Sequence, residues 1–289
     1  MDKMILYIIS DQRSGSTLLE NILSKSSKTI PVGELRLLYN YIKEVGVGNT
    51  ERWKCSCGEK LVNCNFWSAV LNELNVTVSH FPQTKIKGNG IFIDLLKSKK
   101  SVCNKKYNQE TLSFLGDLYT EIFKKSEKNI IIDSSKNPMQ GICVYDKVKY
   151  PVKIIYLKRD LRAITYSKVK WKEKLRGENY GLFKMLTINK LRSFRRMRML
   201  NFISPKDKVT IHYKDLATNT SKTLKKICNS LSLPYFDPPE YMYVHDDIHT
   251  IAGTPNKNKK RKIKYDDSWR RKMRGMPFFR LYSKILNIS

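Results

Sequence analysis

The 289-residue sequence lacks a hydrophobic run long enough to cross a membrane, and it is poor in acidic residues. A membrane-spanning helix needs about 18 or more consecutive apolar residues, and no segment approaches that length. The opening segment MDKMILYIIS is apolar only briefly and has no small-residue cleavage site, so we expect no signal peptide. We therefore expect a cytoplasmic protein that contacts a membrane only peripherally, if at all.

A linker is also lacking. No stretch rich in proline, glycine and serine divides the chain, and one α/β domain of this length has room for a sizeable core. The hydrophobic content of 41% is typical of a globular protein. We therefore expect a single domain over residues 1–289.

The six cysteines lack the spacing of a disulfide-stapled domain, and we expect free thiols. Cys55, Cys57 and Cys64 follow a C-x-C-x₆-C pattern, which would suggest zinc with Cys103 or His80 as a fourth ligand. Structural zinc sites normally show two clear ligand pairs, so we expect no metal here.

The shortage of acidic residues leaves a strong positive charge. Lys and Arg total 55 against 26 Asp and Glu, giving a formal net charge of +29. Such a balance favours anionic partners: a nucleotide, a nucleic acid, an acidic polymer or a lipid surface. Because no aromatic-stacking motif or known nucleic-acid-binding module accompanies the lysines, we expect no specific nucleic acid partner.

Hydrophobic periodicity indicates an α/β fold. Short runs rich in Ile, Val and Tyr predict buried parallel strands at 4–10, 129–133, 152–158 and 208–212. Helical patterns lie between them, at 16–27, 108–126, 160–175, 180–202 and 219–231. In such a fold, ligands bind at the carboxyl ends of the strands.

The loop DQRSGSTLLE directly follows the first predicted strand and resembles a phosphate-binding loop without its lysine. Aligned with G-x-x-x-x-G-K-[ST], the loop has Ser16 at the lysine and Thr17 at the final hydroxyl. Gly15 lets the backbone approach an anion at a helix N-terminus, while Arg13 and the hydroxyl of Ser14 add donors. A tight strand-to-helix turn is the alternative interpretation.

Basic residues also follow the next predicted strands. Lys136 ends the strand in IIIDSSKNP, and Arg159 ends the strand in KIIYLKRDLRAITYS. Asp160 could cap the following helix, and Ser167 lies about two helical turns after Arg159. Arg159 and Ser167 could together hold a phosphate group, although solvated charges at strand ends are common.

As an ordered series, the motifs of this chain resemble the sulfotransferase family. The series comprises RSGSTLL, GELRLL, CSCG followed by CNFW, DSSKNP, YLKRDLRAITYS, HYKDL and HTIAGTP followed by DDSWRRK. It is most similar to the bacterial-type enzymes and more distantly to tyrosylprotein sulfotransferases. The resemblance implies a P-loop-like three-layer sandwich, with a central parallel sheet flanked by helices. It also implies a variable acceptor-side excursion at about 35–128 and a basic nucleotide-covering segment at about 245–275.

The resemblance implies the donor 3′-phosphoadenosine 5′-phosphosulfate and the product adenosine 3′,5′-bisphosphate, with no metal required. The residues around the 5′-phosphosulfate would be Arg13, Ser14, Gly15, Ser16 and Thr17. Arg159 and Ser167 would bind the 3′-phosphate, and Arg261 in the late basic run would add a contact from the covering segment.

The same resemblance assigns catalytic roles to Glu34, Lys136 and Arg13. Glu34, in VGELRLL, would take the proton of the acceptor, and Arg36 could orient the acceptor or modulate the carboxylate. Lys136 would stabilise negative charge on the leaving oxygen. His245 and His249 are the alternative bases.

No motif identifies the hydroxyl or amine acceptor. The basic charge favours an anionic saccharide, an acidic peptide tyrosine or a lipid-linked glycan, with a small alcohol or amine as the alternative. The rival functions are a nucleotide kinase, which Ser16 at the lysine position disfavours, and nucleic-acid binding.

In the basic helix at 180–202, we expect Leu191, Phe194 and either Met197 or Met199 to face the core. The C-terminal segment PFFRLYSKIL is expected to dock on the domain, with an anionic membrane as the alternative.

Overall fold

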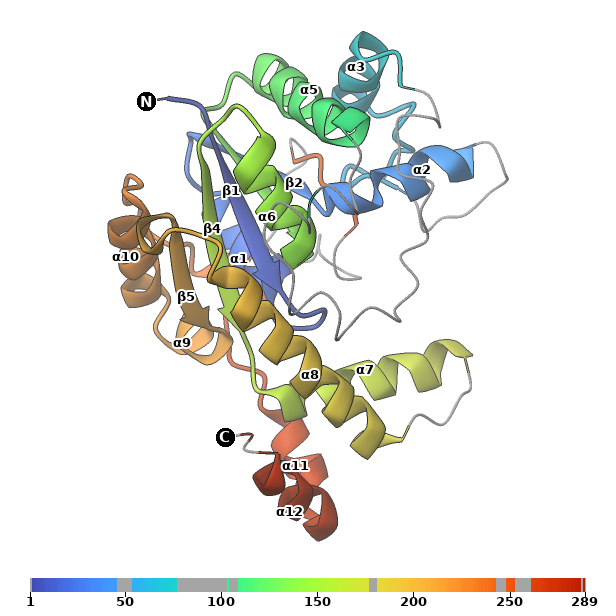
Figure 1. Cartoon of the computed structure of the whole chain (residues 1–289), viewed down its shortest axis with the longest axis vertical. Helices are drawn as coiled ribbons and strands as arrows, with labels where there is room; N and C mark the ends of the chain where they lie inside the picture. Colours follow the sequence, from blue (N-terminus) through green and yellow to red (C-terminus); the bar gives the residue numbers. More distant parts are fainter. Residues whose placement is uncertain are drawn as a thin grey trace.

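A computed structural model of the protein describes residues 2–45, 54–76, 103, 109–176, 181–242, 248–252, 261–286 and 288. Its centre is a parallel sheet of five strands in the order β2-β3-β1-β4-β5 (Figure 1). The strands are β1 (Met4–Ser10), β2 (Thr29–Gly33), β3 (Ile130–Lys136), β4 (Val152–Lys158) and β5 (Lys208–His212).

Both faces of the sheet are buried, as the near-continuous apolar run of β1 requires. Ile5, Tyr7 and Ile9 pack into one hydrophobic cluster, and Leu6 and Ile8 pack into another on the opposite face. The first cluster is covered mainly by α3 (Asn65–Glu73), α5 (Gln109–Ser126) and α6 (Pro138–Lys147). The second is covered by α1 (Ser16–Leu23), α9 (Tyr213–Thr218) and α10 (Thr220–Leu231). The result is the predicted three-layer α/β sandwich (Figure 1).

The remaining helical elements pack around this sandwich. They are η1 (Leu35–Leu37), α2 (Leu38–Val45), α7 (Leu161–Arg176), α8 (Leu182–Leu200), η6 (Pro205–Asp207), α11 (Ser268–Arg274) and α12 (Pro277–Ile285). A short antiparallel pair joins β6 (Tyr241–Met242), just before the predicted covering segment, to β7 (Arg261–Lys262) inside it.

The apolar face predicted for α8 is wrong. Leu191, Phe194 and Met197 are 38%, 49% and 47% exposed, whereas Met199 is buried as one of the two alternatives. Beside the apolar Met185, Leu186, Met199 and Leu200, the buried face of α8 carries the polar side chains of Asn189 and Arg196. These side chains satisfy charged partners inside the protein, and that requirement overrides the hydrophobic pattern.

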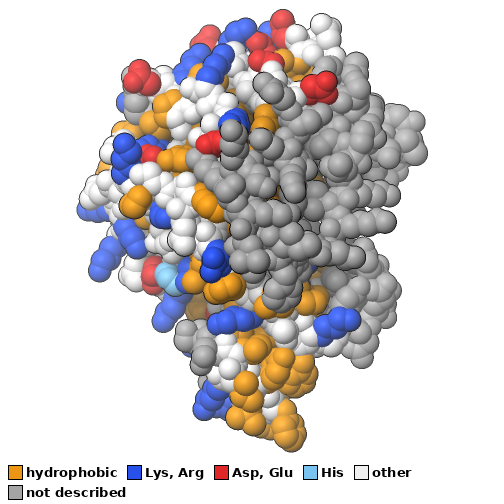
Figure 2. Space-filling model, in the orientation of Figure 1, with side chains coloured by type: hydrophobic (Ala, Val, Ile, Leu, Met, Phe, Trp, Pro, Cys, Tyr) orange, Lys and Arg blue, Asp and Glu red, His pale blue; other side chains and the backbone are white. Residues whose placement is uncertain are grey.

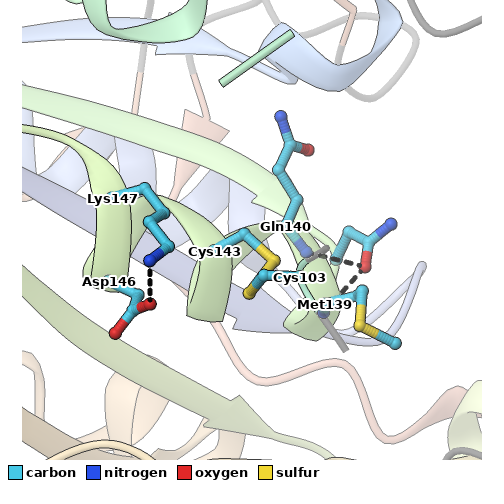
Figure 3. The surroundings of a disulfide bond; sticks show 7 residues. Cys103, Met139, Gln140, Cys143, Asp146 and Lys147 are labelled. Atoms are coloured by element: carbon cyan, nitrogen blue, oxygen red, sulfur yellow. Dashed lines mark hydrogen bonds and ion pairs between the residues drawn. A yellow bond between two sulfur atoms is a disulfide. The ribbon is translucent and has the colours of Figure 1, made fainter. Parts of the chain in front are cut away.

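The prediction of six free thiols is also wrong. Cys103 and Cys143 are both fully buried and form a disulfide, with their Cα atoms 5.4 Å apart (Figure 3). Because 40 residues separate the two cysteines in sequence, local spacing gives no sign of the bond. The disulfide also removes Cys103 from the candidate zinc ligands, and His80 lies outside the described residues.

The C-terminal helix α12 docks through one face. Phe279 is 1% exposed and packs with Ala163, Leu186 and Trp269. Phe278 and Ile285 stay exposed, and hydrophobic side chains gather at this end of the molecule in Figure 2. Docking is thus confirmed for the Phe279 face, while contact with a membrane stays a prediction. None of the helices in the described part of the chain is long and apolar enough to span a membrane.

Candidate active site

The predicted site residues follow the carboxyl ends of four neighbouring strands. Glu34 follows β2, Lys136 ends β3, the glycine loop follows β1, and Arg159 follows β4. With strands about 4.8 Å apart, the three intervals from β2 to β4 span about 14 Å. This row of strand carboxyl ends, called the carboxyl edge of the sheet, therefore has a carboxylate and an ammonium at its β2 end and guanidinium groups at its β4 end, with the glycine loop between them.

The glycine loop, residues 11–15, turns directly from β1 into α1. Gly15 is the N-cap of α1 with φ 94°, a left-handed conformation that favours glycine. A Cβ atom at Gly15 would also lie only 2.4 Å from Cδ2 of Tyr213, whose ring covers the loop from α9. The glycine is thus required by both backbone and packing, and the tight turn leaves the α1 N-terminus at the sheet edge.

Arg13 and Arg159 converge beside this loop. Arg13 donates from Nε to Ser167 Oγ on α7 at 2.9 Å, and Arg159 donates from Nη1 to the carbonyl oxygen of Arg13 at 2.9 Å. Burial and the charge of Arg159 lower the pKa of Arg13, against the opposing effect of Asp266. Two cationic side chains thus meet beside the loop, and their charges favour an anion there.

Arg159 itself is held by the start of the C-terminal region. Its Nη2 donates to the backbone oxygen of Asp266 at 3.2 Å and to the Asp266 carboxylate at 3.1 Å, and its guanidinium stacks 4.4 Å from the Tyr213 ring centroid. Its buried Nε–H has no hydrogen-bond partner among the described residues. Because a buried unsatisfied donor is costly, this group is available for a ligand oxygen.

A buried charge network behind the loop fixes its position, and sequence reasoning missed it. The Asp11 carboxylate pairs with Lys168 Nζ of α7 at 3.3 Å and with Arg196 of α8. The Asp11 carbonyl oxygen accepts from Ser14 Oγ at 2.6 Å, and Lys168 also donates to Asn189 at 2.9 Å. Sequence alone could not pair Asp11 with helices more than 150 residues away.

At the other end of the edge, Glu34 lies between two cations. Its Oε1 accepts from Lys136 Nζ at 2.5 Å and its Oε2 from Arg36 Nη2 at 2.7 Å, and the residue is 6% exposed. Burial would raise the pKa of Glu34, but the charges and hydrogen bonds of Lys136 and Arg36 outweigh it and lower the pKa. Glu34 is therefore a carboxylate whose basicity depends on where Lys136 lies.

Unusual backbone conformations at Lys136 and Gly33 bring Lys136 and Glu34 together. Lys136 has φ 65°, an uncommon conformation for a residue other than glycine, where β3 pairs irregularly with its neighbours. Gly33 has φ 76°, and a Cβ there would lie 2.1 Å from the carbonyl oxygen of Ile251. The Gly33-Glu34 pair is thus explained by a chain segment that crosses the end of β2.

That crossing segment comprises residues 248–252. Ile251 N donates to Val32 O at 3.0 Å, and Glu34 N donates to Ile251 O at 2.9 Å. His249 lies in the segment, and its Nδ1 is 3.2 Å from Cys64 Sγ and 3.8 Å from Cys55 Sγ. This contact with thiols makes His249 a poor alternative base, while His245 lies outside the described residues.

A second carboxylate lies beneath Glu34. Asp133 is fully buried in β3, accepting from Tyr119 Oη at 2.6 Å and from Ser135 N at 2.8 Å. Burial raises its pKa to about 6, with a smaller contribution from Glu34, although the hydrogen bonds oppose the rise. Ser135 Oγ in turn accepts from the backbone N of Arg36 at 3.1 Å. Asp133 therefore fixes the backbone of Ser135, whose hydroxyl in turn holds the backbone of Arg36 two residues after Glu34.

The structure brings the other predicted residues to the edge with one exception. Ser14 and Ser16 are buried in the loop and at the start of α1, where Thr17 is half-buried, and Asp160 caps α7 by accepting from Arg162 N at 2.8 Å. Arg261 lies in β7, but its side chain is outside the described residues.

The cysteine motif can hold a metal. The Sγ atoms of Cys55, Cys57 and Cys64 and a ring nitrogen of His249 all lie within 4.8 Å of one another. Burial raises the pKa of Cys55 and Cys64, while backbone N–H groups of Cys57 and Trp67 that face these sulfurs oppose the rise. Sequence reasoning found the three cysteines and missed His249 as their partner.

Neither a family model nor a curated protein matches the chain. Among solved structures, the sulfotransferase domain of the olefin synthase from Synechococcus PCC 7002 is similar over 98% of this chain and 94% of that domain, with 19% identity and a TM-score of 0.56. The sulfotransferase domain from the curacin biosynthetic pathway is similar over 100% and 99%, with 16% identity and a TM-score of 0.56. The chain therefore has the sulfotransferase fold that its motifs predicted.

Proposed function

We propose that the protein is a sulfotransferase that moves a sulfuryl group from 3′-phosphoadenosine 5′-phosphosulfate to a hydroxyl or amine acceptor. The observation that carries this proposal is the arrangement of one sheet edge in a chain with this fold. Guanidinium groups that favour an anion lie at one end, and a carboxylate paired with an ammonium lies at the other.

The guanidinium end fits the 3′-phosphate of this donor. Arg159 and Ser167 offer charged and neutral donors to that dianion, including the unpartnered Nε–H of Arg159, while Arg13, hydrogen-bonded to both residues, would reach the 5′-phosphosulfate. The loop between the two ends would hold the 5′-phosphosulfate through the N-terminus of α1 and the hydroxyl groups of Ser16 and Thr17. A loop lysine is not needed, because the donor has no triphosphate.

The other end supplies proton acceptance and charge neutralisation. The donor provides the sulfuryl group, Glu34 accepts the acceptor's proton, and Lys136 neutralises negative charge on the oxygen that departs. Because Lys136 lowers the pKa of Glu34, any shift of its ammonium toward a ligand oxygen makes Glu34 more basic. Donor binding would in this way prepare the base.

Ligand-dependent thermal unfolding tests the proposal against its rivals. Adenosine 3′,5′-bisphosphate should stabilise the fold by about 2.7 kcal/mol at 100 times its Kd, while ATP with magnesium or an oligonucleotide should stabilise it far less. Stronger stabilisation by ATP with magnesium would favour a nucleotide kinase. Stronger stabilisation by the oligonucleotide would favour a nucleic-acid-binding protein.

Two glycine variants sharpen the comparison. Gly15→Ala would place a Cβ against Tyr213 and should abolish stabilisation by the bisphosphate. Gly116→Ala is the matched control, because a Cβ at that position in α5 meets nothing within 4 Å. The acceptor can then be found by incubating the protein with labelled donor and a fractionated extract, and identifying the labelled product by mass.

A further inference from the structure

Four ligand atoms from two distant parts of the chain form a compact cluster beside the proposed active site. Cys55, Cys57 and Cys64 come from the segment before α3, and His249 comes from the segment that crosses β2. Cys64 Sγ and Cys55 Sγ lie 3.2 Å and 3.8 Å from His249 Nδ1. In a tetrahedral zinc site with Zn–S of about 2.3 Å and Zn–N of about 2.0 Å, sulfur and nitrogen are about 3.5 Å apart. The cluster therefore has the dimensions of such a site.

The backbone around the cysteines is folded to present their sulfurs to one point. Gly58 N donates to Cys55 O at 3.0 Å, closing a turn that contains Cys57, and Gly58 adopts φ 95° in the left-handed region. Cys55 N donates to Glu59 O at 2.8 Å, and Cys64 then begins α3 as its N-cap. Local hydrogen bonds thus fix the three thiols before His249 is added.

We propose that Cys55, Cys57, Cys64 and His249 bind one zinc ion in a closed, structural site. Three thiolates and an imidazole are a ligand set that zinc prefers over harder cations. Four protein ligands leave no open position, so the ion holds chain segments together and takes no part in chemistry. The proposal reverses our expectation of no metal, because the structure brings His249, which we had not considered as a ligand, to the three cysteines.

The site would fix the position of Glu34 through the crossing segment. Trp67 Nε1 donates to His249 O at 3.0 Å, and Ser56 and Thr250 exchange hydrogen bonds of 2.7 Å and 3.1 Å. Two residues later, Ile251 O accepts from the backbone N of Glu34. Zinc would therefore join the cysteine segment to the backbone of the proposed base, Glu34. The role in positioning Glu34 rests on the proposed sulfotransferase function, whereas zinc binding itself does not.

Metal content of the full chain tests the proposal directly. Protein purified under reducing conditions without chelators should contain about one zinc per chain by elemental analysis. After exchange with cobalt, it should show the visible absorption of a tetrahedral cobalt–thiolate site. A chain that holds no zinc even after zinc is supplied overturns the proposal.

Variants separate ligands from other cysteines. Cys64→Ser and His249→Ala should weaken zinc affinity by more than the roughly 10- to 100-fold that loss of a supporting hydrogen bond causes. Cys228→Ser is the matched control, because this buried free cysteine lies in α10 outside the cluster and should leave zinc content unchanged. If the buried-site variants fail to fold, Cys57→Ser at the less buried ligand gives the same comparison. Zinc binding at wild-type affinity in the ligand variants refutes the assignment, whatever the protein does with an adenosine bisphosphate.

Discussion

Replacing Glu34 by Gln tests the proposed base most sharply. The glutamine retains the size of the side chain and one carbonyl oxygen, but it cannot accept from both Lys136 and Arg36 without turning its own N–H donors toward a cation. If Glu34 takes the acceptor's proton, turnover should fall by roughly 10² to 10⁴-fold. At about 1.36 kcal/mol for each factor of ten, that is about 3 to 5 kcal/mol of barrier.

The same change also removes a buried charge, so stability has to be measured beside rate. Removing one partner of a buried pair costs about 3 to 5 kcal/mol, and the retained oxygen of Gln should place this variant at the lower end. Glu73→Gln is the matched control, since its pair with Lys125 is 3.1 Å long and the Glu73 side chain is 57% exposed. Exposed pairs contribute about 0 to 1 kcal/mol, so that variant should retain both stability and turnover.

The assay is single-turnover transfer at saturating donor on the acceptor found by the labelling experiment, with donor affinity measured separately. Because Lys136 and Arg36 lower the pKa of Glu34, the wild-type rate should show no acid limb from this carboxylate near neutral pH. An acid limb near 6.5, the ordinary pKa of histidine, would point to His245. Near-normal single-turnover chemistry in folded Glu34→Gln would refute the assignment.

Four further predictions concern the supporting residues. Ser167→Ala should weaken adenosine 3′,5′-bisphosphate by about 0.5 to 1.5 kcal/mol in calorimetry and leave adenosine 5′-phosphate nearly unchanged, and equal weakening would contradict its 3′-phosphate role. Arg159→Ala should cost the bisphosphate more, about 1.5 to 3 kcal/mol, with some loss for both ligands because Arg159 also holds the loop. Asp133 has its pKa raised to about 6, so its protonated form stabilises the fold at low pH and that contribution, about 3 kcal/mol, is lost as pH rises from about 4 through 6. In Asp133→Asn, the free energy of unfolding measured in urea should therefore change less with pH over that range. An unchanged pH dependence would mean that another group causes it. Asp11→Asn should destabilise the protein by about 3 to 5 kcal/mol in denaturant unfolding, because it leaves two buried cations without their carboxylate, and a loss below about 1 kcal/mol would contradict the network.

Sequence patterns predicted β1, β3, β4 and the edge strand β5, and missed β2 at the other edge of the sheet. The bounds of β1, β4 and β5 match the prediction: β1 and β4 are mainly apolar and buried, and β5 alternates buried Val209 and Ile211 with more exposed residues. By contrast, β2 has the sequence TIPVG, and its proline and glycine argue against a central strand. The sheet order places β2 at an edge, where a proline is tolerated. A short strand of this kind is recognisable only once its neighbour β3 is known.

In the candidate site, residues at strand ends could be predicted from local sequence, whereas their partners from distant parts of the chain could not. Residues that a strand end delivers directly, such as Arg13, Lys136 and Arg159, were found because the topology of a parallel sheet brings strand ends together. The partners that fix those residues come from elsewhere in the chain. Asp11 pairs with α7 and α8, and Gly15 also leaves room for Tyr213 of α9, so these two contacts could not be read from the loop sequence.

The crossing of β2 by residues 248–252 connects these observations into one physical arrangement. Gly33 is required because Ile251 passes too close for any side chain, and the same Ile251 carbonyl fixes the backbone of Glu34. Two residues earlier, His249 joins the cysteine cluster, so the position of the crossing is set from the cluster side as well. A base whose pKa depends on an ion pair of 2.5 Å tolerates little displacement, because the coulombic energy changes steeply at such short separations. Anchoring the crossing segment on both sides is therefore a physical means of keeping Glu34 within reach of Lys136.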